Sequence, residues 1–288
     1  MTPPLVGALL CALIATTVAP QEPGSFPLLV EPVPAPPPVI PPQPTLRDEL
    51  DAALSELDSG ELEGSPAELA LLARDEVTRL GSVAVGLPHR GALLNAVQMP
   101  EGDGYDLVDP KHSWGTLESV MALSLVLERL HRDDPAAPVL QVGQLSRQSG
   151  GWLKRHKSHQ NGRDVDLGLY YLNGVHWYLK GTAENLDVPR TFKLVSMLVD
   201  TELVEYVFLD RAIIAMLREY AQSLGVSVEQ QQRLFYDPIS APEGAMRHAW
   251  GHNNHMHVRF KSPRAEARGQ QLTARLAALG LIAKRRWY

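Results

Sequence analysis

The stretch HNNHMH at residues 252–257 decides the fold, and it runs directly into VRF at residues 258–260. Residues 256–260 favour a β-strand, and side chains two residues apart on a strand point to the same face. We therefore expect His255 and His257 to lie on one face. Four of the chain's ten histidines fall between His248 and His257, and clustered imidazoles of this kind indicate a metal site.

A second stretch, SHQNGRDVDL at residues 158–167, supplies the matching half. Gly162 permits a sharp turn, so His159 on a loop can fold over the start of the following strand. Asp164 and Asp166 are two apart and share one strand face. Two imidazoles, one carboxylate and a water are the usual ligands of a catalytic zinc. A nitrogen and oxygen set without thiolate favours zinc over copper or an iron–sulfur centre.

Motifs that the chain lacks exclude other hydrolases. It contains no H-E-x-x-H, the helix-borne motif of the common zinc proteases. It also contains no S-x-x-K and no G-x-S-x-G, so serine chemistry of the penicillin-binding or α/β-hydrolase type is absent. A hydrolase with this sequence must use a water activated by a metal ion.

The combined motifs resemble those of the penicillin-insensitive murein endopeptidases, within the lysostaphin and D-Ala-D-Ala metallopeptidase group. The shared signature is a histidine, six residues and an aspartate, followed at a distance by H-x-H; here these are His159, Asp166 and residues 255–257. The similarity extends to His156, to the DVD run and to His252. It covers roughly residues 80–263.

The resemblance implies a role for each matching residue. His159, Asp166 and His257 match the family's zinc ligands, and Zn²⁺ is the implied cofactor. His255 matches a histidine that is not a ligand and would accept a proton from the zinc-bound water. His252 matches a further catalytic histidine. In some relatives the histidine at the position of His156 holds a second metal.

Three functions compete at this stage. The first is a zinc-dependent murein endopeptidase that hydrolyses D-alanyl-diaminopimelate cross-links, with peptidoglycan as its substrate. The second is a zinc D-Ala-D-Ala carboxypeptidase, for which Arg163 is the only cation beside the motifs that could hold a free carboxylate. The third is a non-catalytic cell-wall-binding protein, which would have no need of His252 and His255. The sequence leaves the oligomeric state unknown.

The N-terminus predicts export. An apolar run of 14 residues, 5–18, is too short for a membrane span and suits a signal peptide. We expect a signal peptide at residues 1–19, and no stable membrane span once it is removed. Residues 20–44 hold 11 of the 23 prolines and form an extended linker. The expected location is periplasmic or secreted. A net charge of −6 argues against a nucleic-acid partner.

Beyond the linker we expect a helical N-terminal extension at residues 45–80 and a zinc metallopeptidase catalytic domain at residues 81–288. The predicted fold class is α+β: a small antiparallel sheet that carries the zinc site and is flanked by helices. Apolar spacing and capping residues predict helices at 46–57, from Pro66 to Leu80, at 116–132, from Asp210 to about Gly225 and at 264–279. Strands are predicted at 139–142, 165–171, 204–209 and 256–260.

Overall fold

The computed structural model describes residues 44–58, 64–284 and 286–287. The described residues belong to one compact unit. The predicted signal peptide, and the linker up to residue 43, lie outside the described residues. No helix in the described part of the chain is long and apolar enough to span a membrane.

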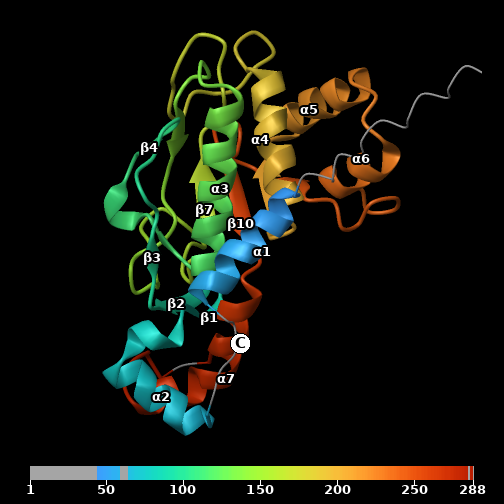
Figure 1. Cartoon of the computed structure of the whole chain (residues 1–288). Helices are drawn as coiled ribbons and strands as arrows, with labels where there is room; N and C mark the ends of the chain where they lie inside the picture. The colour runs from blue at the N-terminus through green and yellow to red at the C-terminus, as the bar shows by residue number, and fades with distance from the viewer. Residues whose placement is uncertain (1–43, 59–63, 285, 288) are drawn as a thin grey trace, which may run out of the picture. The chain divides into compact units, whose positions relative to one another are not determined.

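Helices occur near the beginning, in the middle and near the end of the described part of the chain (Figure 1). Their bounds are α1 Leu46–Leu57, α2 Pro66–Asp75, α3 Leu117–Asp133, α4 Val188–Asp200, α5 Arg211–Ser223, α6 Val228–Leu234 and α7 Pro263–Ala278. Two 3-10 turns are η1 Val77–Leu80 and η2 Pro110–His112.

A six-stranded sheet forms the centre of the fold, with the order β4-β6-β7-β10-β8-β9. Its strands are β4 Tyr105–Leu107, β6 Leu140–Val142, β7 Asp164–Leu167, β8 Val204–Leu209, β9 Met246–His248 and β10 Met256–Phe260. Two small two-stranded sheets pair β1 Val83–Leu87 with β2 Arg90–Leu94, and β3 Val97–Gln98 with β5 Trp114–Gly115.

The two faces of the central sheet have different chemistry because side chains alternate along each strand. On β7 and β10 the apolar side chains Val165, Leu167 and Val258 are buried in the main hydrophobic core, which includes residues of α3 and α4. The alternate positions on the same strands, Asp166 and His257, therefore face away from these helices. This polar face carries the candidate site.

Helices α2 and α7 form a second, smaller core beside β1. Leu69 of α2 and Leu272 of α7 are buried there together with Val83 and Val85 of β1. The salt bridge between buried Arg268 of α7 and Asp58, the residue that caps α1, ties this region to the first helix. Residues of the expected helical extension thus pack against the C-terminal helix.

Most of the predicted helices and strands are present. Strands 204–209 and 256–260 have the predicted bounds. The helices α1, α3, α5 and α7 agree with their predicted ranges to within about two residues. Ser65 and Glu68 form a capping box at the start of α2.

Two predictions about individual elements were wrong. Helix α2 was expected to reach Leu80, but it ends at Asp75 and a 3-10 turn follows. Glu76 ends the helix with a φ of −142°, which lies outside the helical range. The strand predicted to run to residue 171 ends at Leu167, where Gly168 follows.

The sheet itself is mixed, and not purely antiparallel as predicted. The three inner pairings, β6–β7, β7–β10 and β10–β8, are antiparallel. The outer pairings, β4–β6 and β8–β9, are parallel. Parallel neighbours need a crossover connection, and α3 provides it between β4 and β6. The short edge strands β4 and β9 were not predicted.

Candidate metal centre

Strand pairing brings the two histidine-containing stretches together. In the β7–β10 register His257 lies directly opposite Asp166. His159 reaches the same point from the loop before β7, in a left-handed backbone conformation with φ of 65°. Gly162 makes the turn with φ of 78°, and a Cβ there would lie 2.6 Å from Leu93 Cδ2. The prediction that Gly162 folds His159 over the start of the strand is confirmed.

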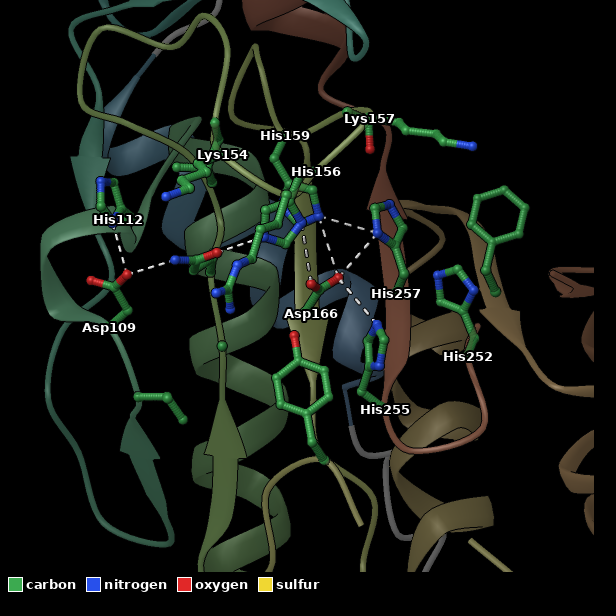
Figure 2. Close-up of a pocket in the computed structure, with 18 of the residues that line it drawn as sticks. Asp109, His112, Lys154, His156, Lys157, His159, Asp166, His252, His255 and His257 are labelled. Atoms are coloured by element: carbon green, nitrogen blue, oxygen red, sulfur yellow. Dashed lines mark hydrogen bonds and ion pairs between the residues drawn. The ribbon is translucent and has the colours of Figure 1, made fainter. Parts of the chain in front are cut away.

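Three atoms form a near-equilateral triangle on the polar face of the sheet (Figure 2). His159 Nε2 is 3.3 Å from Asp166 Oδ1, His257 Nδ1 is 3.1 Å from the same oxygen, and the two nitrogens are 3.2 Å apart. In a tetrahedral site with metal–ligand bonds of about 2.0–2.1 Å, two ligand atoms lie roughly 3.3–3.4 Å apart. The triangle therefore fits three ligands of one metal ion.

The outer nitrogen of each imidazole faces an oxygen atom, so the inner nitrogens point toward one another and toward Asp166. His159 Nδ1–H donates to the carbonyl of Leu145 at 2.7 Å, so its Nε2 carries the lone pair. His257 Nε2 lies 3.2 Å from the buried carboxylate of Asp164, which favours a proton on that nitrogen and leaves Nδ1 to bind. A partner on the second nitrogen fixes the tautomer and orientation of a ligating histidine. Asp164 is itself held by Arg259 at 2.7 Å.

His156 joins the same group of side chains. Its Nδ1 is 3.5 Å from Asp166 Oδ2, and His156, His159 and Asp166 together could hold a metal ion. His156 Nε2–H donates to Gln144 Oε1 at 2.5 Å, and the Gln144 amide donates to Asp109 at 2.6 Å. Because Gln144 fixes the proton on Nε2, the lone pair of Nδ1 faces Asp166.

His255 and His252 lie beside this group and are less enclosed. His255 comes just before β10, and its Nε2 is 4.0 Å from Asp166 Oδ1. Its Nδ1–H donates to Asn254 Oδ1 at 2.7 Å, so Nε2 is the nitrogen that can accept a proton. His252 donates from Nδ1 to the Trp250 carbonyl, and its ring is 5.0 Å from that of His255.

The electrostatics of the site favour a bound cation. Burial raises the pKa of Asp164 and Asp166, but the facing His257 and His159 outweigh burial, so both pKa values lie well below the usual range. Burial lowers the pKa of His257, but Asp164 and Asp166 outweigh it and raise this pKa to about 9. A proton and a metal ion compete for the same Nδ1 lone pair, and two ionised carboxylates stabilise either one.

His255 and His252 have the opposite tendency. Burial, and then the charge of His252 and His257, lowers the pKa of His255 to about 4 despite the opposing charge of Asp166. Burial and then His257 lower the pKa of His252 as well. Both side chains are therefore neutral at neutral pH and can accept a proton.

The triangle lies in an open cleft of about 1060 Å³, which is also lined by His252 and His255. Its walls come from segments that are far apart in the sequence, including residues 108–112, 152–159 and 249–252. Trp152 and Trp250 are exposed at 64% and 85% and line the cleft with Trp177. A chain several residues long can lie across such a cleft.

Arg163 does not line the cleft. The sequence suggested that it could meet a substrate carboxylate, but its side chain is buried and forms ion pairs with Glu266 and Glu205. The pairing leaves no guanidinium free at this position for a substrate. The sequence left open that Arg163 could hold a free carboxylate, and the structure does not support this role, because the side chain is turned toward Glu205 of β8 and Glu266 of α7.

Two residues of the site were missed in the sequence. Gln144 lies twelve positions before His156 in the sequence and orients its ring through a hydrogen bond. It belongs to no motif that the sequence reveals. Tyr178 lines the cleft, with its ring centroid 5.2 Å from that of His255. Burial, and then the charge of Asp166, raises the pKa of Tyr178. The positive φ of 60° at Tyr178 is a structural signal that the sequence does not reveal.

A buried set of two imidazoles and a carboxylate at the floor of an open cleft, with neutral histidines beside it, is the arrangement of metal-dependent hydrolases. Residues 84–239 match the family described as penicillin-insensitive murein endopeptidase, and the chain belongs to this family. The chain is thus a peptidase of a family that acts on peptidoglycan. The matched range contains His156, His159 and Asp166 and ends before His252. A search of curated proteins found no match.

Proposed function

We propose that the chain is a zinc-dependent murein endopeptidase that hydrolyses D-alanyl-diaminopimelate cross-links of peptidoglycan. The observation that carries this proposal is the triangle of His159 Nε2, Asp166 Oδ1 and His257 Nδ1 in the cleft of a chain from this family. The absence of thiolate and the spacing of the three atoms support zinc as the ion.

His159, Asp166 and His257 would hold the zinc, and Asp164 and Leu145 would fix the two imidazoles in their binding tautomers. When bound, zinc would lower the pKa of a water toward ~7 and polarise the scissile carbonyl. We expect the peptide to bind in the cleft with its scissile carbonyl over this triangle, because the three residues line the cleft.

In this proposal the neutral side chains of His255 and His252 take part in proton transfer. His255 accepts the proton of the attacking water at Nε2, because its Nδ1 proton is held by Asn254. His252, 5.0 Å from His255 between ring centroids, is placed to steady the oxyanion or the leaving group. His156, held by Gln144, is a further candidate ligand and in this proposal can serve a second metal.

No observation favours either alternative over the activity of the matched family. A carboxypeptidase needs a cation for the free carboxylate, and Arg163, the candidate in the sequence, is paired with Glu266; other cations line the cleft, so the products of digestion distinguish this activity. A wall-binding module would not need His252 and His255 in the cleft. The predicted signal peptide and proline-rich linker fit an enzyme exported to the periplasm or beyond, with a tether that reaches the wall.

Digestion of purified murein, followed by mass spectrometry of the products, tests the proposed activity. An endopeptidase converts cross-linked dimers to monomers without releasing free D-alanine. Release of D-alanine from uncross-linked stems would instead show a carboxypeptidase. Binding of murein without any product would show a wall-binding module.

A further inference from the structure

The cleft carries positive charge that the metal site does not use, and we call the residues that supply it the cationic wall. Arg147, Lys154 and Lys157 line the cleft and are exposed. Lys111 and Arg155 line it as well. This concentration of cations occurs in a chain whose net charge is −6. A basic cleft on an acidic protein concentrates anionic ligands.

The acidic side chains in the cleft do not neutralise these cations. Asp109 accepts hydrogen bonds from His112 and Gln144, and Asp166 belongs to the metal group. Among the described residues, no carboxylate lies within 4.0 Å of the side-chain nitrogens of Arg147, Lys154 or Lys157. Cations outside the cleft such as Arg190 and Lys193 are paired with aspartates.

The loop that presents Lys154 and Lys157 is built into the site. The backbone N–H of Gly151 donates to the Gln160 carbonyl at 2.9 Å and closes the base of the loop. Leu153 is buried, and His156 is bonded to Gln144 between the two lysines. Figure 2 shows Lys154 and Lys157 on either side of His156 and His159. The two ammonium groups are thus attached to the same loop as a metal ligand.

We propose that Arg147, Lys154 and Lys157 bind carboxylates of the substrate peptide and align it across the metal site. The inference rests on the proposed function, since murein stems with γ-linked glutamate and diaminopimelate leave carboxylates free along the peptide. Ion pairs at the rim of a site contribute mainly to substrate capture and orientation. The cationic wall therefore favours acidic stems over stems whose carboxylates are amidated.

The test compares two triple variants with the same change in charge. The first is Arg147→Gln, Lys154→Gln, Lys157→Gln. The control is Arg132→Gln, Lys180→Gln, Lys261→Gln, at exposed positions that do not line the cleft. Arg155 is left unchanged because its φ of 74° would mix a backbone effect with the loss of charge.

Steady-state kinetics on a soluble cross-linked muropeptide dimer give the expected result. KM should rise about 10-fold in the cleft variant, since each exposed ion pair contributes roughly 2–5-fold, while kcat and zinc content change little. The wild-type KM should rise with salt and with amidation of the substrate, and the KM of the cleft variant, which keeps only Lys111 and Arg155 of these cations, should respond less to both. An unchanged KM, or an equal rise in the control variant, would overturn the inference.

Binding of the same dimer, measured by calorimetry, separates this inference from the proposed function. If the wild type binds but does not cleave, the proposed function fails, and weaker binding by the cleft variant alone still supports the cationic wall. If the wild type cleaves and both proteins bind equally well, the wall is a solvated surface. Absence of binding by the wild type contradicts the inference directly.

Discussion

The segments 156–166 and 252–257 supply histidines to one cleft but hold them differently. His159 and Asp166 are buried, at 1% and 2% exposure, and His159 is bonded to a main-chain carbonyl of another segment. His252 and His255 are partly exposed, and each is bonded to a neighbour in its own loop. Rigid partners suit metal ligands, whereas groups that transfer protons need access to water and substrate.

His257 shows how the sheet divides these tasks. It lies two residues after His255, but it is on β10, where pairing with Asp166 buries it. His255 precedes the strand and stays at the edge of the cleft. His257, the expected ligand, thus lies on a paired strand, whereas His255, the expected base, lies in the loop before that strand.

Loss of the shared carboxylate should have the largest effect. Asp166→Ala removes the oxygen that contacts both His159 Nε2 and His257 Nδ1. Asp164 is then the carboxylate that still faces His257. We expect loss of stoichiometric zinc and at least ~10⁴-fold lower turnover, since general-base help alone contributes ~10²–10⁴-fold. Metal analysis and kinetics on one preparation check this. Retention of zinc by a folded Asp166→Ala protein would exclude Asp166 as a ligand.

A substitution in the second segment should separate metal binding from catalysis. His255→Ala should fold, keep its zinc and lose about 10²–10⁴-fold in kcat. Zinc content and turnover are measured together. If zinc disappears with the activity, His255 is a ligand and His252 becomes the candidate base; if both are unchanged, the proposed proton path is wrong.

A smaller loss of metal affinity is expected when Asp164, whose carboxylate lies 3.2 Å from His257 Nε2, is replaced. Asp164→Asn keeps the shape of the side chain but weakens the hold on His257 Nε2 and on Arg259. Replacing a residue that holds a metal ligand in place typically lowers the metal affinity about 10–100-fold. Competition with a chelator should show that loss, with zinc still bound at saturating concentrations. An affinity equal to that of the wild type would mean that Asp164 does not orient His257.

The smallest effect concerns pH. Burial and the neighbouring histidines lower the pKa of His255 to about 4, so this base stays neutral, and usable, as pH falls from 7 toward 5 and is protonated only near pH 4. Turnover per bound zinc should therefore stay level down to about pH 5. The zinc content is measured at each pH, because protons also compete for the ligands. A decline centred near ~6.5, the ordinary histidine value, would show that another group is the base.

Local chemistry made much of this molecule predictable. Apolar spacing marked helices α3 and α5, and the six-residue spacing marked His159 and Asp166. Helix α4 was missed, although its buried residues Thr191, Val195 and Leu198 follow a helical spacing and Asp187 caps it; packing against α3 and α5 stabilises it. Strand order and the contacts of Gln144 depend on segments far apart in the sequence, which local patterns do not reveal.

Anomalous diffraction at the zinc edge, from crystals of the protein, would show whether a metal ion binds between the two segments. We expect a strong peak in the cleft, about 2.0–2.2 Å from His159 Nε2, Asp166 Oδ1 and His257 Nδ1, with His255 Nε2 outside bonding distance. A peak bonded to His255 in place of His257, or zinc-containing crystals without a peak at this triangle, would exclude the proposed site.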